Sequence, residues 1–179
     1  RLDKGELVSR PMKGTADRGL TSEEDEENRS ALERSEKNRA ENVMIVDMVR
    51  NDMGRVAEPG SVHVERLFDV EKYPTVFQMT STVKSRTGAG VAEVFRALFP
   101  CASITGAPKI RTMEIIRELE TAPRGVYTGA IGCLSPDGRA VFNVAIRTVV
   151  IDKRRQIAEY GVGGGIVWDS DAASEYEEC

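Results

Sequence analysis

The sequence contains few of the residues that most often carry reactive chemistry by themselves. Its 179 residues include one histidine and three cysteines. Cys101, Cys133 and Cys179 are odd in number, widely spaced and without a Cys-x-x-Cys pair, which favours reduced thiols over disulfides or a zinc site. The single histidine, His63, lies in a stretch that reads as an exposed strand, so we interpret it as a surface residue.

Long apolar runs and an excess of positive charge are also missing. No segment approaches the length of a membrane span, and no charged and then apolar leader opens the chain. The formal charge of −4, with a pI near 5.3, argues against a surface for nucleic acid or anionic membranes. Because 40% of the residues are hydrophobic, we expect a soluble globular domain, or part of a larger one. Since neither a membrane span nor a leader is seen, we expect the protein in the cytoplasm.

Capping signals and hydrophobic spacing predict helices in the first two thirds of the chain. Thr21 and Ser22, followed by Glu24, are typical of a capping box, and we expect one long helix from here to Met53 with its second half buried. Gly54 is a plausible stop for this helix. Shorter helices are predicted over residues 91–99 and 108–120.

Alternating and β-branched residues predict strands elsewhere. The expected strands cover residues 62–67 and 76–83, followed by an antiparallel meander over 126–134, 140–151 and 156–160. Strong turn signals separate the segments of the meander. The sequence therefore predicts an α+β fold, with mixed and largely antiparallel sheets packed against helices.

Residues 11–15, Pro-Met-Lys-Gly-Thr, place Lys13 in a tight turn after a strand-like run. Such a turn can aim an ammonium group into a cleft. Taken alone, a lysine beside a glycine is more often a solvated loop residue. Other motifs along the chain change the balance between these two interpretations.

Five further motifs, in their order along the chain, resemble one family. They are residues 39–52 (Arg-Ala-Glu-Asn-Val-Met-Ile-Val-Asp-Met-Val-Arg-Asn-Asp), 103–109 (Ser-Ile-Thr-Gly-Ala-Pro-Lys), 145–148 (Ala-Ile-Arg-Thr), 161–170 (Gly-Val-Gly-Gly-Gly-Ile-Val-Trp-Asp-Ser) and 174–178 (Ser-Glu-Tyr-Glu-Glu). The chain resembles the chorismate-utilising enzymes, which include anthranilate synthase, isochorismate synthase and para-aminobenzoate synthase component I. Within the family, Lys13 resembles the branch that forms aminodeoxychorismate, because anthranilate synthases typically carry alanine there.

The resemblance implies a function. It implies amination of chorismate at C4 to 4-amino-4-deoxychorismate, for para-aminobenzoate and folate synthesis, with Lys13 as the nucleophile and ammonia supplied by a glutamine amidotransferase subunit. It also implies that residues 1–179 are part of the catalytic domain, without its N-terminal half and last helix. The substrate contacts that it implies are Gly14, Thr15, Tyr127, Arg147, Gly163, Gly164 and Gly165.

A magnesium ion is the implied cofactor. Glu175 and Glu178 are three residues apart in a helix-like segment, so they share a face, and carboxylate oxygens suit magnesium. Taken alone, such a pair usually faces solvent. By the resemblance, Glu41 and Glu178 are the direct ligands and Glu175 supports them. We therefore expect Glu41, Glu175 and Glu178 to converge on a pocket that faces Lys13.

Two residues depart from the pattern of the family. Gln78 occupies a position where many relatives have histidine, so an acid–base role at this position is lost. Asn38 stands one turn before Glu41, where relatives carry another acid. A general acid of related enzymes belongs to a Ser-Pro-Glu segment upstream of residue 1.

Alternative interpretations remain open. The glycine run 161–165 could form a simple bulge or turn instead of an anion site, while a nucleotide loop is disfavoured because no lysine followed by serine or threonine completes it. Within the same chemistry, the alternatives are anthranilate synthase component I and isochorismate synthase. A different class of protein, a non-catalytic acidic interaction module, would use the same motifs only as core and turns.

Overall fold

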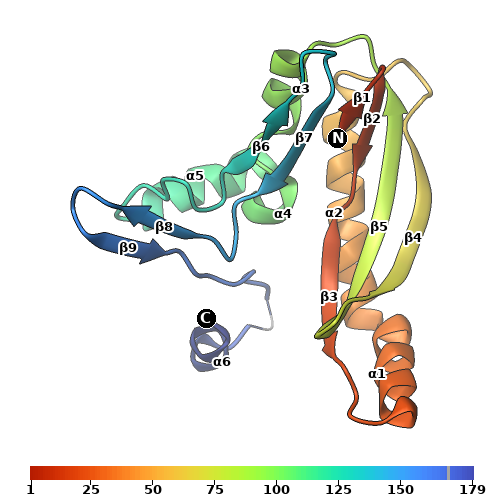
Figure 1. Ribbon diagram of the computed structural model, residues 1–179, viewed down its shortest axis with the longest axis vertical. Coiled ribbons are helices and arrows are strands. Elements are labelled where there is room, and N and C mark those ends of the chain that lie inside the picture. The colour runs from red at the N-terminus through yellow and green to blue at the C-terminus, as the bar shows by residue number, and fades with distance from the viewer. Residues whose placement is uncertain (169) are drawn as a thin grey trace. The chain divides into compact units, whose positions relative to one another are not determined.

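The computed structural model describes residues 1–168 and 170–179, and for Glu178 it describes the backbone alone. These residues form two compact units: the first comprises residues 1–99 and 134–140, and the second comprises 100–133 and 141–179. Each unit combines helices with antiparallel strand pairs (Figure 1). The predicted α+β class is therefore confirmed.

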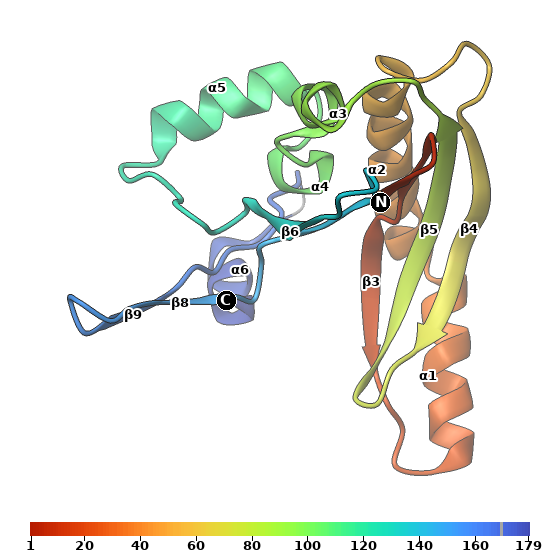
Figure 2. The same ribbon diagram turned by 45° about the horizontal axis from the view of Figure 1, so that its top comes forward.

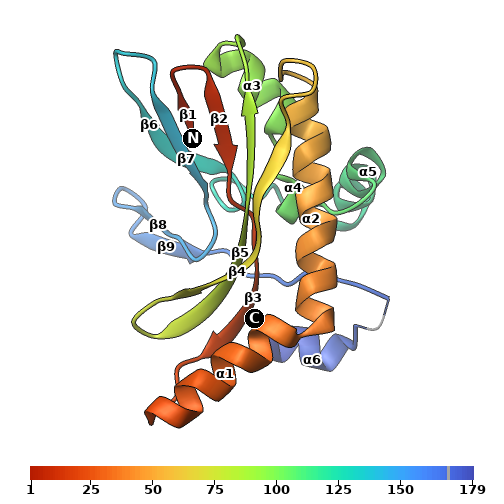
Figure 3. The ribbon, with the colours of Figure 1, turned by 90° about the vertical axis from the view of Figure 1, so that its right-hand side faces the viewer.

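The first unit is built around strand β5, which has paired neighbours on both edges. Strand β4 pairs along one edge, while β2 and β3 follow one another along the other edge, and β1 pairs with β2 (Figure 3). Where β2 passes into β3, the Ser81 N–H donates a hydrogen bond of 3.0 Å to the Pro11 carbonyl. The strands are β1 (Leu2–Asp3), β2 (Glu6–Ser9), β3 (Met12–Asp17), β4 (His63–Lys72) and β5 (Val76–Arg86).

The long helix predicted between residues 22 and 53 is in fact two helices. They are α1 (Ser22–Arg34) and α2 (Glu36–Gly54). Ser35 separates them, with φ −64° and ψ 108°, because its hydroxyl accepts a hydrogen bond from the Asn38 N–H and so caps a new helix. The predicted capping box of Thr21 and Glu24 at the start of α1 is confirmed.

The core of the first unit lies between these helices and β5. From α1, Leu32 packs with Phe77 and Met79 of β5. Helix α2 contacts the same strand. Its buried residues begin at Asn42 and are mostly apolar, so the second half of the predicted helix is the more buried part, as the hydrophobic spacing predicted. These buried residues of α2 are Asn42, Ile45, Val46, Val49, Asp52 and Met53. The third helix of the unit, α3 (Val91–Leu98), contacts α2.

The second unit contains short helices and two strand hairpins (Figure 2). The predicted meander is wrong in two places: residues 126–129 form a turn, and the expected strand 140–151 is broken at residues 145–148. Strands β8 and β9 accordingly form a separate two-stranded sheet. The elements are α4 (Ala102–Thr105), α5 (Lys109–Leu119), β6 (Ala130–Leu134), β7 (Ala140–Val144), β8 (Val149–Asp152), β9 (Ile157–Tyr160) and α6 (Ala172–Glu178).

The single histidine and the cysteines are found as the sequence predicts. His63 is exposed at the start of β4, as predicted, and all three cysteines are free thiols. None of the helices in the described part of the chain is long and apolar enough to span a bilayer.

An ion-pair network fixes the corner where β3 passes into α1. The Asp25 carboxylate accepts hydrogen bonds from the Arg18 guanidinium at 2.5 and 2.8 Å, from Lys72 at 2.8 Å and from the Gly19 N–H at 3.1 Å. Both cations also lie near the Phe77 ring, with Arg18 5.1 Å from its centroid. The Arg18 hydrogen bonds, followed by that of Lys72, hold the pKa of Asp25 well below its ordinary value.

Asp25→Asn should therefore make the protein less stable at neutral pH and change how its stability responds to acid. The lowered pKa of the folded state means that the charged carboxylate stabilises the fold above its unfolded pKa of about 4, and that this contribution is lost as the pH falls toward the folded value. Melting temperatures measured between pH 2 and pH 7 should fall more steeply with acid for the wild type than for the variant. Asp47→Asn, which removes an exposed ion pair with Arg50, is the control. Parallel curves for wild type and Asp25→Asn would contradict the assignment.

One face of the β8–β9 hairpin is apolar and exposed. Val149 pairs with Tyr160 and Ile151 with Ala158, and directly opposed residues share a face. Val149, Ile151 and Tyr160 are 55%, 66% and 52% exposed. A continuous apolar strand face of this kind favours association.

We expect the isolated 179-residue chain to self-associate through this face. The double variant Val149→Thr, Ile151→Thr should raise the fraction of monomer, measured by light scattering after size exclusion. Val150→Thr, on the same strand but the opposite face, is the matched control and should leave the distribution unchanged. Equal effects of both variants would sink the idea.

Candidate functional site

Lys13 lies in a β-bulge of strand β3. Met12 is opposite Thr80 and Thr15 is opposite Gln78, so Lys13 and Gly14 together oppose Met79. The extra residue breaks the alternation of the strand, and bulges commonly redirect side chains next to functional sites. The Lys13 side chain is half-buried and makes no ion pair with any of the described residues. The predicted tight turn at Lys13 is therefore wrong: the residue lies within a strand, in an irregular but hydrogen-bonded segment.

The two residues that follow Lys13 are hydrogen-bonded to Gln78. The Gln78 side-chain N–H donates to the Gly14 carbonyl at 2.8 Å, and the Thr15 hydroxyl donates to the Gln78 Oε1 at 3.2 Å. The sequence alone marks Gln78 only as a departure from histidine and does not reveal these contacts. The pairing register of β3 and β5 is the signal that reveals them, and it cannot be obtained from one sequence.

Helix α2 approaches the bulge from the other side. Gly14 has φ +99°, and a Cβ on it would lie 3.1 Å from the Asn38 Cβ and Cγ. Asn38 is itself fixed, since its side-chain N–H donates to the Ser35 hydroxyl at 2.9 Å. Glu41 is three residues further along, on the same side of the helix as Asn38. Its side chain is half-buried and has no hydrogen-bond or ionic partner within the described residues.

The second unit brings another part of the predicted site together. A Cβ on Gly161 would lie 2.4 Å from the Tyr127 Cγ, and one on Gly163 would lie 3.1 Å from the Tyr127 hydroxyl. A Cβ on Gly164 would lie 2.7 Å from a Glu175 carboxylate oxygen. The glycine run therefore passes close to Tyr127 and Glu175, which explains why side chains are excluded there.

Glu175 is oriented by hydrogen bonding at the start of α6. The Ser170 hydroxyl donates to its Oε1 at 2.6 Å, and the Val167 N–H donates to the same hydroxyl oxygen at 3.0 Å. Asp171 caps the helix by accepting from the Ser174 N–H at 3.1 Å, and this hydrogen bond lowers the Asp171 pKa. One carboxylate oxygen of Glu175 is thus engaged, while the other faces Gly164.

Two predicted site residues are placed differently from the rest. Arg147, which the sequence placed on a strand, lies exposed in the break between β7 and β8 with φ 50°. Gly165 is exposed outside regular structure.

The predicted metal ligands divide between the two units. Glu41 belongs to the first unit and Glu175 to the second, and the Glu178 side chain lies outside the described residues. Within the part of the chain that the structure describes, no three carboxylate, histidine or cysteine side chains form a metal-binding group. The expected convergence of the three glutamates on Lys13 stays a prediction.

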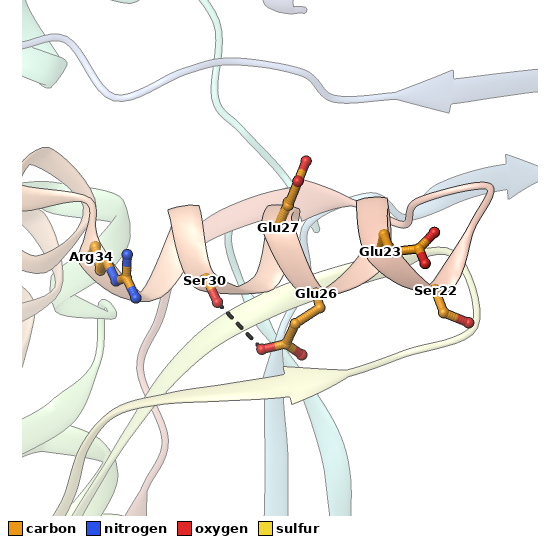
Figure 4. Close-up of a pocket in the computed structure, with 6 residues that line it drawn as sticks. All are labelled: Ser22, Glu23, Glu26, Glu27, Ser30 and Arg34. Carbon is orange, nitrogen blue, oxygen red and sulfur yellow. Dashed lines mark hydrogen bonds between the residues drawn. The ribbon is translucent and has the colours of Figure 1, made fainter.

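Two of the hollows on the described residues belong to the first unit. One, of about 490 Å³, lies on the exposed side of α1 and is lined by Ser22, Glu23, Glu26, Glu27, Ser30 and Arg34 (Figure 4). It contains none of the predicted site residues. The other, of about 360 Å³, is bordered by Thr15 of β3, by Leu32 of α1 and by Asn38 of α2. It therefore borders the segment that carries Lys13.

Comparison with known proteins gives a consistent family. The chorismate binding enzyme family matches residues 1–179. A probable chloroplastic aminodeoxychorismate synthase of Oryza sativa subsp. japonica is 50% identical over 99% of this chain and 20% of its own length. Aminodeoxychorismate synthase component 1 of Klebsiella aerogenes is 48% identical over 99% of this chain and 40% of its own length. The chain thus spans well under half of these relatives.

Solved structures agree with the sequence comparison. Anthranilate synthase component I from Streptococcus pneumoniae TIGR4 has a TM-score of 0.87 at 40% identity, covering 99% of this chain and 39% of that one. The menaquinone-specific isochorismate synthase from Escherichia coli has a TM-score of 0.85 at 22% identity, covering 97% of this chain and 40% of that one. The second likeness concerns the fold alone.

Gly14→Ala should destabilise the protein more than the same change at another positive-φ glycine. Gly60, at φ +77°, has open space around its Cβ position, so Gly60→Ala should cost only the backbone strain, about 1–2 kcal/mol. Gly14→Ala adds the collision with Asn38, about 1–3 kcal/mol more. Denaturant unfolding of the full-length protein measures both. Asn38→Ala should restore part of the loss in Gly14→Ala, and a lack of coupling between these two changes would contradict the contact.

Proposed function

Because the chain belongs to the chorismate binding enzyme family, we propose that the full-length protein aminates chorismate at C4, forming 4-amino-4-deoxychorismate for para-aminobenzoate and folate synthesis. The observation that carries the proposal is the position of Lys13. It lies in a bulge with Gly14, which is hydrogen-bonded to Gln78 on one side and contacts Asn38 on the other. Relatives 48–52% identical to the chain and described as aminodeoxychorismate synthases support the same choice.

In the proposed mechanism the Lys13 amine is the nucleophile. The nitrogen forms a bond to C2 of chorismate as the C4 hydroxyl leaves with the electrons of its C–O bond and a proton. Ammonia then attacks C4, the bond between the lysine nitrogen and C2 breaks, and the neutral amine is restored after a proton is lost from the new ammonium group. Two displacements replace one difficult direct substitution.

The substrate contacts are proposed on chemical grounds. Arg147 has a guanidinium that can hold a carboxylate through two hydrogen bonds. Gly163, Gly164 and Gly165 would offer backbone N–H groups to an anion, because they carry no side chains of their own that would block it. The remaining proposed contacts are Gly14, Thr15 and Tyr127.

Magnesium is proposed as the cofactor, held by Glu41, Glu175 and Glu178. Glu41 fits this role because its half-buried carboxylate has no cationic partner among the described residues, and burying an unpaired charge is costly. When bound, the ion would supply positive charge to the ring carboxylate of chorismate. The ordering of Glu175 by Ser170 is consistent with a carboxylate that is positioned for a ligand.

The ammonia is proposed to come from a glutamine amidotransferase partner. Several relatives are described as component 1, a name that implies a second component. We propose that the reaction takes place in the cytoplasm, although plant relatives are described as chloroplastic.

Anthranilate synthesis is the second candidate. Component 1 of the anthranilate synthase from Aquifex aeolicus is 43% identical over 99% of this chain, so overall similarity does not separate the two reactions strongly. The residue at position 13 separates the two reactions, because substitution at C4 through a lysine adduct needs an amine nucleophile. Lysine at this position favours the C4 product.

Lys13→Ala in the full-length protein should abolish formation of 4-amino-4-deoxychorismate from chorismate and ammonia, measured by chromatography with mass detection. Binding of chorismate should weaken by no more than about tenfold, or about 1.4 kcal/mol, because Lys13 is not the main anchor. Lys37→Ala, at an exposed lysine of α2, is the control. Near-normal turnover by Lys13→Ala would refute the covalent route, and anthranilate as the product of the wild type would support the second candidate.

A further inference from the structure

The bulge that carries Lys13 leaves backbone groups that the strand ladder does not pair in the regular way. Lys13 and Gly14 face one residue of β5, Met79, so the hydrogen-bond ladder is interrupted between Met12 and Thr15. A backbone carbonyl freed in this manner is satisfied by water or by a side chain. At Gly14 the partner is the side chain of Gln78.

Gln78 is suited to this position because an amide donates and accepts at the same time. Its N–H reaches the Gly14 carbonyl at 2.8 Å, and its Oε1 accepts from the Thr15 hydroxyl at 3.2 Å. The two contacts flank the peptide between Gly14 and Thr15. Together they restrict the backbone directly after Lys13.

The opposite side of the bulge is also restrained. Asn38 of α2 occupies the space beside Gly14, and Ser35 holds Asn38 through two hydrogen bonds, at 3.3 Å to its N–H and 2.9 Å to its side chain. Gly14 is therefore held between a strand side chain and a helix side chain. Of these two side chains, Gln78 is the one that forms a hydrogen bond to the bulge, at the Gly14 carbonyl, and it also accepts from Thr15.

We propose that Gln78 is a positioning residue that fixes the bulge and thereby sets the direction from which the Lys13 amine attacks. The inference rests on the proposed function, in which Lys13 is the nucleophile. A loss of about 1 Å in placement can cost about 100-fold in rate, so a small change of this bulge would be visible in turnover.

We expect the fold itself to tolerate the loss of the Gln78 amide. Its neighbours on β5, Phe77 and Met79, are fully buried and pack with Leu32, whereas Gln78 is only partly buried. Removing its amide should therefore change the placement of Lys13 without unfolding the first unit. This difference separates a positioning role from a purely structural one.

The test compares Gln78→Met and Gln78→Glu with the wild type in the full-length protein, using chorismate and ammonium as substrates. Methionine keeps a similar length but removes both hydrogen bonds, while glutamate keeps an acceptor for Thr15 and loses the donor to Gly14. Thr80→Val is the matched control, because Thr80 lies on the same strand and its hydroxyl bonds the Asp69 carbonyl of β4. Both Gln78 variants should lower kcat by about 100-fold with little change in KM for chorismate or in melting temperature.

A second measurement does not depend on activity. Labelling of Lys13 by an amine-reactive reagent, followed by mass spectrometry and normalised to Lys37, reports its placement, and hydrogen exchange of residues 13–16 reports the bulge. Both should change in the Gln78 variants and not in Thr80→Val. If they do not change and kcat is retained, the positioning role is overturned.

The possible outcomes also separate this inference from the proposed function. If the wild type does not aminate chorismate at C4, the proposed function fails, while altered Lys13 labelling in Gln78→Met would still support positioning. If the wild type is active and Gln78→Met lowers the melting temperature together with kcat, while the labelling of Lys13 stays unchanged, the role of Gln78 is structural and the inference is overturned. A selective loss of kcat with altered labelling supports it.

Discussion

The burial of strand β5, with both edges paired, is the constraint on which the first unit depends. Its backbone pairs with β4 along one edge and with β2 and β3 along the other. The side chains of Phe77, Met79 and Val83 are fully buried. A one-residue slip of such a strand would exchange its two faces, so its register is strongly specified. Every neighbouring element, including the segment that carries Lys13, takes its position from this register.

A buried polar junction adds specificity between α2 and the sheet. The Ser81 hydroxyl donates to the Asn42 Oδ1 at 2.5 Å and accepts from the N–H of Phe68, which has φ 60°. The Asn42 side-chain N–H finds no partner among the described residues, at a cost of about 1–3 kcal/mol. Apolar burial by α2 offsets that cost. Since Glu41 precedes Asn42, this junction also fixes where Glu41 stands on the helix relative to the sheet.

In the second unit, side chains approach the backbone of glycine residues closely. Tyr127 and Glu175 occupy the space where side chains on Gly161 and Gly164 would lie. Its strands are short and largely exposed, and few of its side chains are buried. In this unit the positions of Tyr127 and Glu175 therefore depend on their close approach to the glycine backbone. In the first unit the positions of the candidate site residues depend on strand register and helix packing.

The sequence alone determined what depends on local patterns. The Thr21 and Glu24 capping box, the end of α2 at Gly54, the α+β class and the family motifs around Lys13 and Glu41 all follow from residues near one another in the chain. Tertiary structure decided the rest. The bulge at Lys13 and Gly14, the contact of Asn38 with Gly14 and the hydrogen bonds of Gln78 depend on how β3, β5 and α2 pack together. The register of β3 and β5 joins positions more than sixty residues apart, such as Thr15 and Gln78, and no local pattern in one sequence encodes such a pairing.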